Sequence, residues 1–212
     1  MKRPPLAPAP QGRRARRSAE TRARILRAAW RLFERQGFFA TTVEQITEAA
    51  DVGKGTFFNY FPSKEHVLAG FGEMQLGKIR AVLDDYRRAP GPIRETLGRL
   101  VVKLAEEPGR SPALVRSLLV ANLSSEPVRQ LWRRNLERGR RLLARLLAEG
   151  QRRGEIRSDR KPLDLARQIQ QTFFGVLLFW AIHPRADLAA RLEETFSLLW
   201  PALESAARRE VN

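Results

Sequence analysis

The stretch of residues 41–65, TTVEQITEAADVGKGTFFNYFPSKE, constrains this chain more than any other part of the sequence. Its first part carries an apolar stripe at the spacing of one helix face, formed by Val43, Ile46 and Ala50. The tripeptide Asp51-Val52-Gly53 then interrupts the pattern. The next segment, residues 54–60, must stop being helical at Phe61, because a residue that precedes proline is pushed out of the helical region. Two short helices joined by a three-residue turn that contains glycine predict a helix-turn-helix.

Polar residues predict where these helices begin. Thr41 followed by Glu44 has the spacing of a capping box, in which each side chain satisfies a backbone amide at the helix start. Ser63 is expected to cap the helix that follows, with Glu65 in its first turn, where a negative charge suits the helix dipole.

The second short helix has the composition of a recognition helix. It offers hydrogen-bond donors with little bulk between them, from Lys54, Thr56, Asn59 and Tyr60. Gly55 would let a phosphate or a base edge approach closely. In helix-turn-helix proteins, the N-terminal residues of this helix contact base edges while its flanks hold phosphates. The segment therefore predicts contact with double-stranded DNA.

This region resembles the tetracycline-repressor (TetR) family of one-component bacterial regulators. The resemblance covers roughly residues 18–70, and its upstream part runs through Ile25, Leu26 and Phe33 to Gly37. The other matching residues are Thr41, Thr42, Val43, Ile46, Ala49, Ala50, Val52, Lys54, Gly55, Thr56, Tyr60, Phe61, Pro62, Ser63, Lys64 and Glu65. Two positions depart from the family pattern. Gly53 stands where members commonly have a Ser or Thr cap, and Phe58 stands where many have Tyr, so one hydroxyl that could reach DNA is absent.

The resemblance implies roles for individual residues. In a homodimer, each half of a near-palindromic operator would be read by Lys54, Gly55, Thr56, Phe58 and Asn59. Phosphates would be held by Thr41, Thr42, Tyr60 and Lys64. Phe57 is expected to anchor the core rather than to contact DNA. Most members are repressors whose C-terminal body responds to a small-molecule effector, so the resemblance implies a repressor that its ligand releases from DNA.

Composition and charge agree with a DNA-binding protein. Helix formers dominate the 212 residues and no window alternates apolar and polar residues convincingly, so an all-α fold is expected. Residues 1–64 hold 13 basic and 5 acidic residues, which is half of the net charge of +16 on less than a third of the chain. Such a concentration of positive charge is the electrostatic footprint that DNA binding requires.

Other classes of protein lack support in the sequence. There is no cysteine, which excludes disulfides and cysteine-based metal sites. No apolar run approaches the ~18 residues that a membrane span needs, and the N-terminus lacks the apolar core of a secretory signal. We therefore expect a cytoplasmic protein without a membrane partner, cofactor or metal.

Three parts are expected along the chain, with about nine helices in all. Residues 1–17 carry four prolines and no acidic residue, which predicts a disordered basic arm. A three-helix DNA-binding domain is expected over residues 18–64. Residues 65–212 are expected to form a helical bundle for effector binding and dimerisation.

The basic arm has two possible roles. Its arginines could reach phosphates or a narrow minor groove, or the arm could add only nonspecific affinity; these arginines are Arg13, Arg14, Arg16 and Arg17. Ser18 is expected to cap the first helix, and Gly37 to end it.

Six helices are expected in the C-terminal bundle, over residues 63–88, 93–106, 111–125, 126–153, 162–183 and 186–208. The first contains Gly70, Gly72 and Gly77, which either allow close packing against another helix or make a deformable lever between ligand and DNA. The helix over residues 162–183 is apolar on all sides, and a second copy of the chain is the simplest cover for it. A homodimer is therefore expected.

The effector cannot be named from the sequence, but candidate pocket residues can. They are chosen on apolarity alone, and ordinary core positions are the alternative for each: Phe71, Met74, Trp132, Phe173 and Trp180. If they line a pocket, an apolar or aromatic effector is expected.

Two other functions compete with the regulator. An enzyme is one, but the two histidines, His66 and His183, lie far apart in sequence, and no HExxH, nucleophile elbow, P-loop or metal-spaced carboxylate pair is present. No catalytic residue is therefore expected. An architectural DNA-binding protein that uses charge without a ligand is the other alternative.

Overall fold

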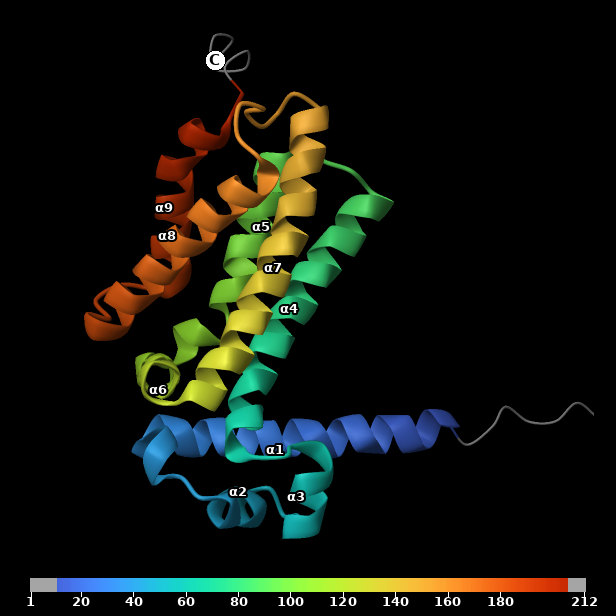
Figure 1. The fold of residues 1–212 in the computed structure, drawn as a ribbon, viewed down its shortest axis with the longest axis vertical. Helices are drawn as coiled ribbons and strands as arrows, with labels where there is room; N and C mark the ends of the chain where they lie inside the picture. Colours follow the sequence, from blue (N-terminus) through green and yellow to red (C-terminus); the bar gives the residue numbers. More distant parts are fainter. Residues whose placement is uncertain (1–10, 206–212) are drawn as a thin grey trace, which may run out of the picture. The chain divides into compact units, whose positions relative to one another are not determined.

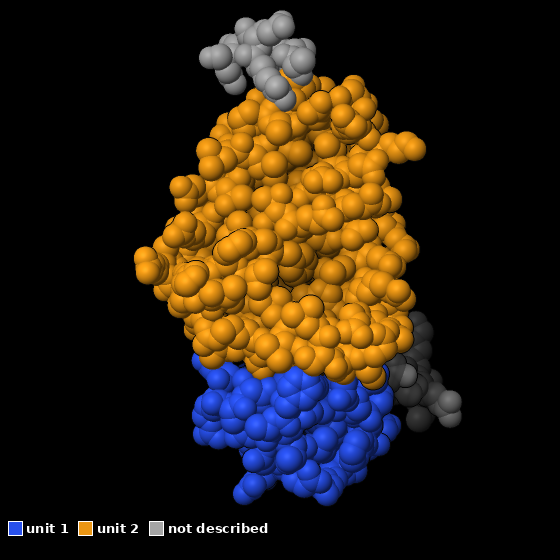
Figure 2. Space-filling view, turned by 60° about the vertical axis from the view of Figure 1, so that its left-hand side comes forward, with its two compact units in different colours: residues 1–67 blue, residues 68–212 orange. Residues whose placement is uncertain are grey.

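The computed structural model describes residues 11–205, and these residues form nine α-helices and one short 3₁₀-helix. The expected all-α fold is confirmed; the one β feature in this range is an isolated bridge between Ile156 and Glu204. The chain divides into two compact units, residues 1–67 and 68–212 (Figure 2). This division lies three residues beyond the boundary expected at residue 64. Each unit is described by itself.

The first helix, α1 (Gln11–Ala40), begins earlier than expected. Ser18 lies inside it, so the prediction that Ser18 is its cap is wrong. Residues 11–17 are helical, which corrects the expected disordered arm over that range, while residues 1–10 lie outside the described residues. Gly37 does interrupt the helix, since its φ of 82° is in the left-handed region that glycine adopts without a steric penalty.

The helix-turn-helix is present as α2 (Val43–Ala49) and α3 (Lys54–Tyr60), two short helices on one side of α1 (Figure 1). The residue of the turn with positive φ is Asp51, at 50°, whereas Gly53 has an ordinary extended conformation. Gly53 caps α3 without a side-chain hydrogen bond. The turn therefore depends on the tolerance of aspartate for the left-handed region rather than on glycine.

A small aromatic core holds unit 1 together. Phe33, Phe57 and Phe61 are almost completely buried. The ring centroids of Phe57 and Phe61 lie 5.9 Å apart, and Phe38 packs edge-on against Phe33 at 5.4 Å. Phe57 is thus a core anchor, as predicted, and it fixes α3 from its inner face.

Unit 2 is a bundle whose helix starts follow the proline and serine signals of the sequence. Ser111 caps its helix by accepting a hydrogen bond from the Leu114 amide, as expected. The last helix begins at Leu188 with Asp187 as its cap, and not at Ala186 as expected. The helices are α4 (Lys64–Arg88), whose first residues belong to unit 1, α5 (Ile93–Ala105), η1 (Pro108–Arg110), α6 (Pro112–Ser124), α7 (Glu126–Arg152), α8 (Pro162–Ile182) and α9 (Leu188–Leu203). Helix α7 packs on α8, and α5 packs on α9 (Figure 1).

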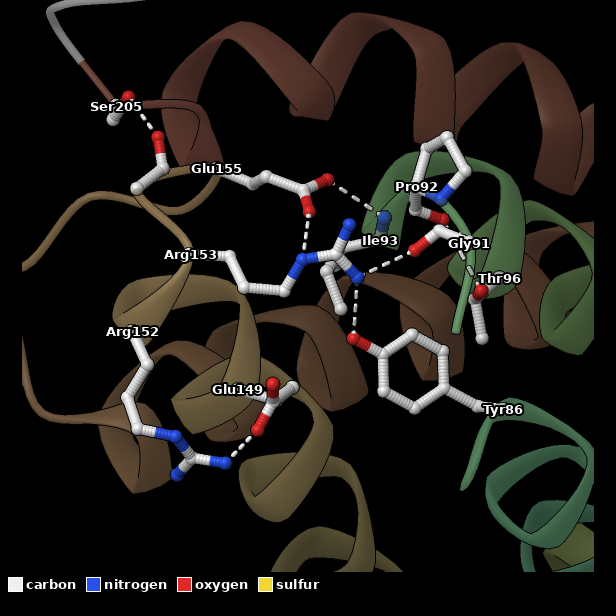
Figure 3. Close-up of polar contacts among 11 residues, drawn as sticks. Tyr86, Gly91, Pro92, Ile93, Thr96, Glu149, Arg152, Arg153, Glu155 and Ser205 are labelled. Atoms are coloured by element: carbon white, nitrogen blue, oxygen red, sulfur yellow. Dashed lines mark hydrogen bonds and ion pairs between the residues drawn. The ribbon is translucent and has the colours of Figure 1, made fainter. Parts of the chain in front are cut away.

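A buried carboxylate joins the helix ends at one end of this bundle (Figure 3). Glu155 is 2% exposed; it accepts a hydrogen bond of 2.8 Å from the Ile93 amide at the start of α5 and pairs with Arg153 at 3.0 Å. Arg153 also donates to the Tyr86 hydroxyl and the Gly91 carbonyl, both at 2.8 Å. The pair therefore fixes the ends of α4, α5 and α7 to one another.

Candidate functional site

The outer face of α3 presents most of the residues that the sequence singled out for base contact. Lys54, Gly55, Phe58 and Asn59 are exposed, while Thr56 is half-buried. Phe58 is 50% exposed, an apolar ring that could contact a thymine methyl group in a major groove. These five residues come from one helix of two turns, and the surface that they form is here called the α3 face.

Thr42, and not Thr41, caps α2. The Thr42 hydroxyl accepts from the Gln45 amide at 3.2 Å, and the Gln45 side chain accepts from the Thr42 amide at 3.0 Å, which completes a capping box. The predicted box of Thr41 with Glu44 is one residue out of register. Thr42 is exposed and can still contact a phosphate.

Thr41 belongs to the interior of unit 1. It is 1% exposed, and its hydroxyl donates to the Gly37 carbonyl at 2.7 Å. The expectation that Thr41 holds a phosphate is therefore wrong, because the hydroxyl is neither accessible nor unpaired. Its bond satisfies the carbonyl that the break at Gly37 leaves without a helical partner.

Lys64 contacts the same part of unit 1 as Thr41 does. Its Nζ donates to the carbonyls of Phe38 and Thr41, both at 2.7 Å, and lies 4.3 Å from the centre of the Phe38 ring. Partial burial lowers the pKa of this lysine. An ammonium has three donors, so only one remains for the predicted phosphate contact.

A carboxylate that the sequence did not point to lies next to Lys54, one of the residues predicted to contact bases. Glu44 Oε1 on α2 lies 2.5 Å from Lys54 Nζ on α3, and the hydrogen bond to Lys54 lowers the pKa of Glu44. The ten-residue separation across a turn gave no signal for this pair, because its geometry depends on the angle between the two helices. Tyr60, the remaining predicted phosphate contact, is half-buried at the end of α3.

Unit 2 contains an apolar cavity of about 210 Å³ that is partly open to solvent and is lined by residues of helices α4 to α9. Three of the predicted pocket residues line it: Phe71, Trp132 and Phe173. Met74 and Trp180 do not, so these two predictions are wrong. Trp180 is 6% exposed in the core, where its indole donates to the Ala186 carbonyl at 2.7 Å.

Four polar side chains interrupt the apolar lining: Gln75, Asn135, Arg140 and Gln170. The Gln75 amide donates weakly to the Leu104 carbonyl at 3.3 Å, and its Oε1 is buried without a hydrogen-bond partner among the described residues. Asn135 lies against Gly72, where an added Cβ would be 2.4 Å from the Asn135 amide nitrogen. Sequence reasoning missed all four, since apolarity was its only criterion.

The outward face of α8 and α9 is apolar. The exposed fractions are 42% for Leu178, 70% for Phe179 and 53% for Ile182 on α8, and 78% for Leu198 on α9. The helix over residues 162–182 is thus buried on one side only within a single chain. Residues 11–205 contain no group of three or more side chains that could hold a metal ion, and none of their helices is long and apolar enough to cross a bilayer.

Known proteins place the chain in a family. Residues 25–70 match the profile of the bacterial regulatory proteins of the tetR family. The crystal structure of Thermus thermophilus FadR, a TetR-family transcriptional repressor in complex with lauroyl-CoA, shares 34% identity with this chain, with 84% of this chain and 92% of that chain covered and a TM-score of 0.64.

Relatives found by sequence are also transcriptional regulators. The transcriptional repressor KstR of Mycobacterium tuberculosis is 28% identical over 91% of this chain and 88% of its own length. The transcriptional regulator TcmR of Streptomyces glaucescens is 50% identical over 56 residues, which are 26% of this chain and 25% of TcmR. The chain belongs to the TetR family of bacterial transcriptional regulators.

Proposed function

We propose that this chain is a transcriptional repressor that binds a near-palindromic operator as a homodimer and leaves it when an apolar small molecule fills the cavity of unit 2. The observation that carries the proposal is the presence of an exposed, donor-rich α3 face in one unit and of an apolar cavity in the other. A protein that bound DNA by charge alone would need neither feature.

The α3 face supplies the reading surface in this proposal. Lys54 and Asn59 have the hydrogen-bonding groups that recognise guanine and adenine edges, respectively, in the major groove. Thr42 and Tyr60 remain the proposed phosphate contacts, with a minor contribution from Lys64. Thr41 is not among the proposed phosphate contacts, because it is buried.

The homodimer is proposed because the outward face of α8 and α9 is apolar. Exposed apolar residues of this size on neighbouring helices mark an interaction surface rather than ordinary solvent-facing positions. Two copies of the chain would bury α8 and α9 in a four-helix interface and present two α3 faces to successive major grooves. A repressor must reach bacterial DNA to act on an operator, so we propose that the protein is cytoplasmic.

Similar proteins support an apolar effector. The Thermus thermophilus FadR structure contains lauroyl-CoA, and a Bacillus subtilis FadR structure, 24% identical and similar in fold, contains stearoyl-CoA. The cavity in this chain has the apolar lining that a hydrocarbon chain or ring requires. The effector is therefore proposed to be an apolar molecule with an acyl chain or a ring of comparable size.

Selection of genomic DNA fragments by the purified protein tests the proposal. Recovery of a shared palindrome, and its release by lauroyl-CoA or by an apolar compound, would support a ligand-responsive repressor. Equal retention of all fragments would favour the architectural alternative instead. If a palindrome is recovered but no apolar compound releases the protein from it, the DNA-binding role stands and the proposed effector is contradicted.

A further inference from the structure

One lining residue of the cavity carries a charge. Among the described residues that line it, only Arg140 has an ionisable side chain, and the others are apolar except for three neutral amides. Arg140 lies on α7 and is half-buried. A guanidinium in apolar surroundings needs polar partners, because the charged form loses hydration that a hydrocarbon lining cannot replace.

The partner of Arg140 within the chain is neutral. Its Nε and Nη2 donate to the Gln170 side-chain oxygen at 3.1 and 3.0 Å, and Gln170 in turn donates to the Leu136 carbonyl at 3.1 Å. Its neighbours Arg138 and Arg141 form ion pairs with Glu73 and Glu137, whereas no such pair involves Arg140 among the described residues. The positive charge at the cavity therefore has a positioning partner but no counter-charge.

The bond to Gln170 leaves part of the guanidinium available. Arginine has five N–H donors in a planar fork, and two of them point to Gln170. The two donors of Nη1 and one of Nη2 remain. One N–H of each of these nitrogens forms the end edge of the guanidinium, which can bind a carboxylate or phosphate through two parallel hydrogen bonds. Gln170 restricts the rotation of the side chain, so this edge is held in place before a ligand arrives.

We propose that the effector is an apolar molecule with one anionic oxygen group, a carboxylate or a phosphate, and that Arg140 binds this group. The inference rests on the proposed function and narrows its ligand class. An apolar lining gives affinity to any hydrocarbon of suitable size, whereas the single arginine distinguishes an acid from the corresponding alcohol. Gln170 is a positioning residue in this account.

Three probes with the same hydrocarbon chain test the proposal: dodecanoate, dodecyl phosphate and dodecanol. Their affinities for the full-length protein are measured by titration calorimetry, with operator release as a second readout. The wild-type protein should bind at least one of the two anions about tenfold or more tightly than the alcohol. The anion that does so identifies the preferred head group.

Three variants separate charge recognition from structural effects. Arg140→Gln should weaken binding of the preferred anion about tenfold or more and change dodecanol binding less than about twofold. Gln170→Glu, which is nearly isosteric, should do the same by supplying an internal counter-charge to Arg140. Arg138→Gln is the matched control, because Arg138 is 56% exposed on the same helix, and it should leave all three affinities unchanged.

Two results would overturn the inference while the repressor stands. One is equal binding of acid and alcohol, with operator release by both and no effect of Arg140→Gln. The other is an equal loss for all probes in Arg140→Gln, since that would assign Arg140 a purely structural role. If no apolar compound, charged or neutral, binds or releases the operator, the proposed effector fails and this inference fails with it.

Discussion

Lys54 Nζ on α3 lies 2.5 Å from Glu44 Oε1 on α2, so the first residue of the proposed recognition helix is paired with a carboxylate of the preceding helix. Both side chains are more than half exposed, at 58% and 59%, and an ion pair of this kind contributes little to stability. The pair positions Lys54 before DNA arrives, but a base edge or phosphate must then compete with Glu44 for the same ammonium.

Replacing this carboxylate should tighten DNA binding. Glu44→Gln keeps the size of the side chain and removes the competing charge as well as its repulsion of phosphates. We expect affinity for operator and for random DNA to rise by about two- to fivefold, the range of an exposed ion pair. Fluorescence anisotropy with labelled duplexes at fixed salt measures both. Weaker operator binding by Glu44→Gln would show instead that the pair orients Lys54 for recognition.

Lys64 should affect folding more than DNA binding. Lys64→Met retains the aliphatic stem but leaves the Phe38 and Thr41 carbonyls without their donor, so unit 1 should lose about 1–3 kcal/mol of stability. Urea denaturation followed by circular dichroism measures this loss. The slope of log operator affinity against log salt concentration should change by less than the amount expected for the loss of one phosphate contact. A drop in slope of about one, with unchanged stability, would restore Lys64 as a phosphate contact.

Two glycines of α4 should respond in opposite directions to alanine. A Cβ at Gly72 would lie 2.4 Å from the Asn135 amide nitrogen, so Gly72→Ala should cost about 1–3 kcal/mol. A Cβ at Gly77 would meet nothing within 4 Å, so Gly77→Ala should stabilise the helix by about 1 kcal/mol. Thermal unfolding of both variants checks the contrast.

The same pair of variants tests the lever hypothesis. Close packing explains Gly72, but no neighbour explains Gly77. If Gly77 makes α4 deformable, Gly77→Ala should reduce operator release by ligand while leaving operator affinity intact. If ligand releases the Gly77→Ala variant from the operator as well as the wild type, the hypothesis of a deformable lever in α4 is contradicted.

The outward face of α8 and α9 should control assembly. Phe179→Asp and Leu198→Asp each place a charge in the proposed dimer interface, and either should weaken dimerisation by about thirtyfold or more. Analytical ultracentrifugation measures the change. Leu123→Asp is the control, because Leu123 on α6 is also 78% exposed but lies outside this face. Equal effects of Leu123→Asp and Leu198→Asp would contradict an α8–α9 interface.

Much of the fold could be predicted because its signals are local. Ser111, Pro112 and Pro162 mark helix starts through their own side chains, and Gly37 marks a break through its backbone. The register of the α2 cap was ambiguous, since Thr41-Glu44 and Thr42-Gln45 have the same spacing and chemistry. Burial of Thr41 against Gly37 decided it, and burial depends on tertiary packing.

The functional surfaces were predicted less evenly. The α3 face follows from one helix, so its residues could be named from sequence. Contacts between distant residues could not, such as Arg140 with Gln170 across thirty positions or Glu44 with Lys54 across a turn. Trp180 failed as a pocket residue because apolarity alone does not distinguish a residue that lines a cavity from one that fills the core.

The most direct test of the central claim compares one operator with random DNA, with and without ligand. A labelled duplex that carries the selected palindrome and a shuffled duplex of the same length are titrated with the protein at physiological salt, before and after addition of lauroyl-CoA. The protein should prefer the palindrome by about 10³ or more and should lose this preference when the ligand is present. Equal affinity for the two duplexes, unaffected by ligand, would contradict it.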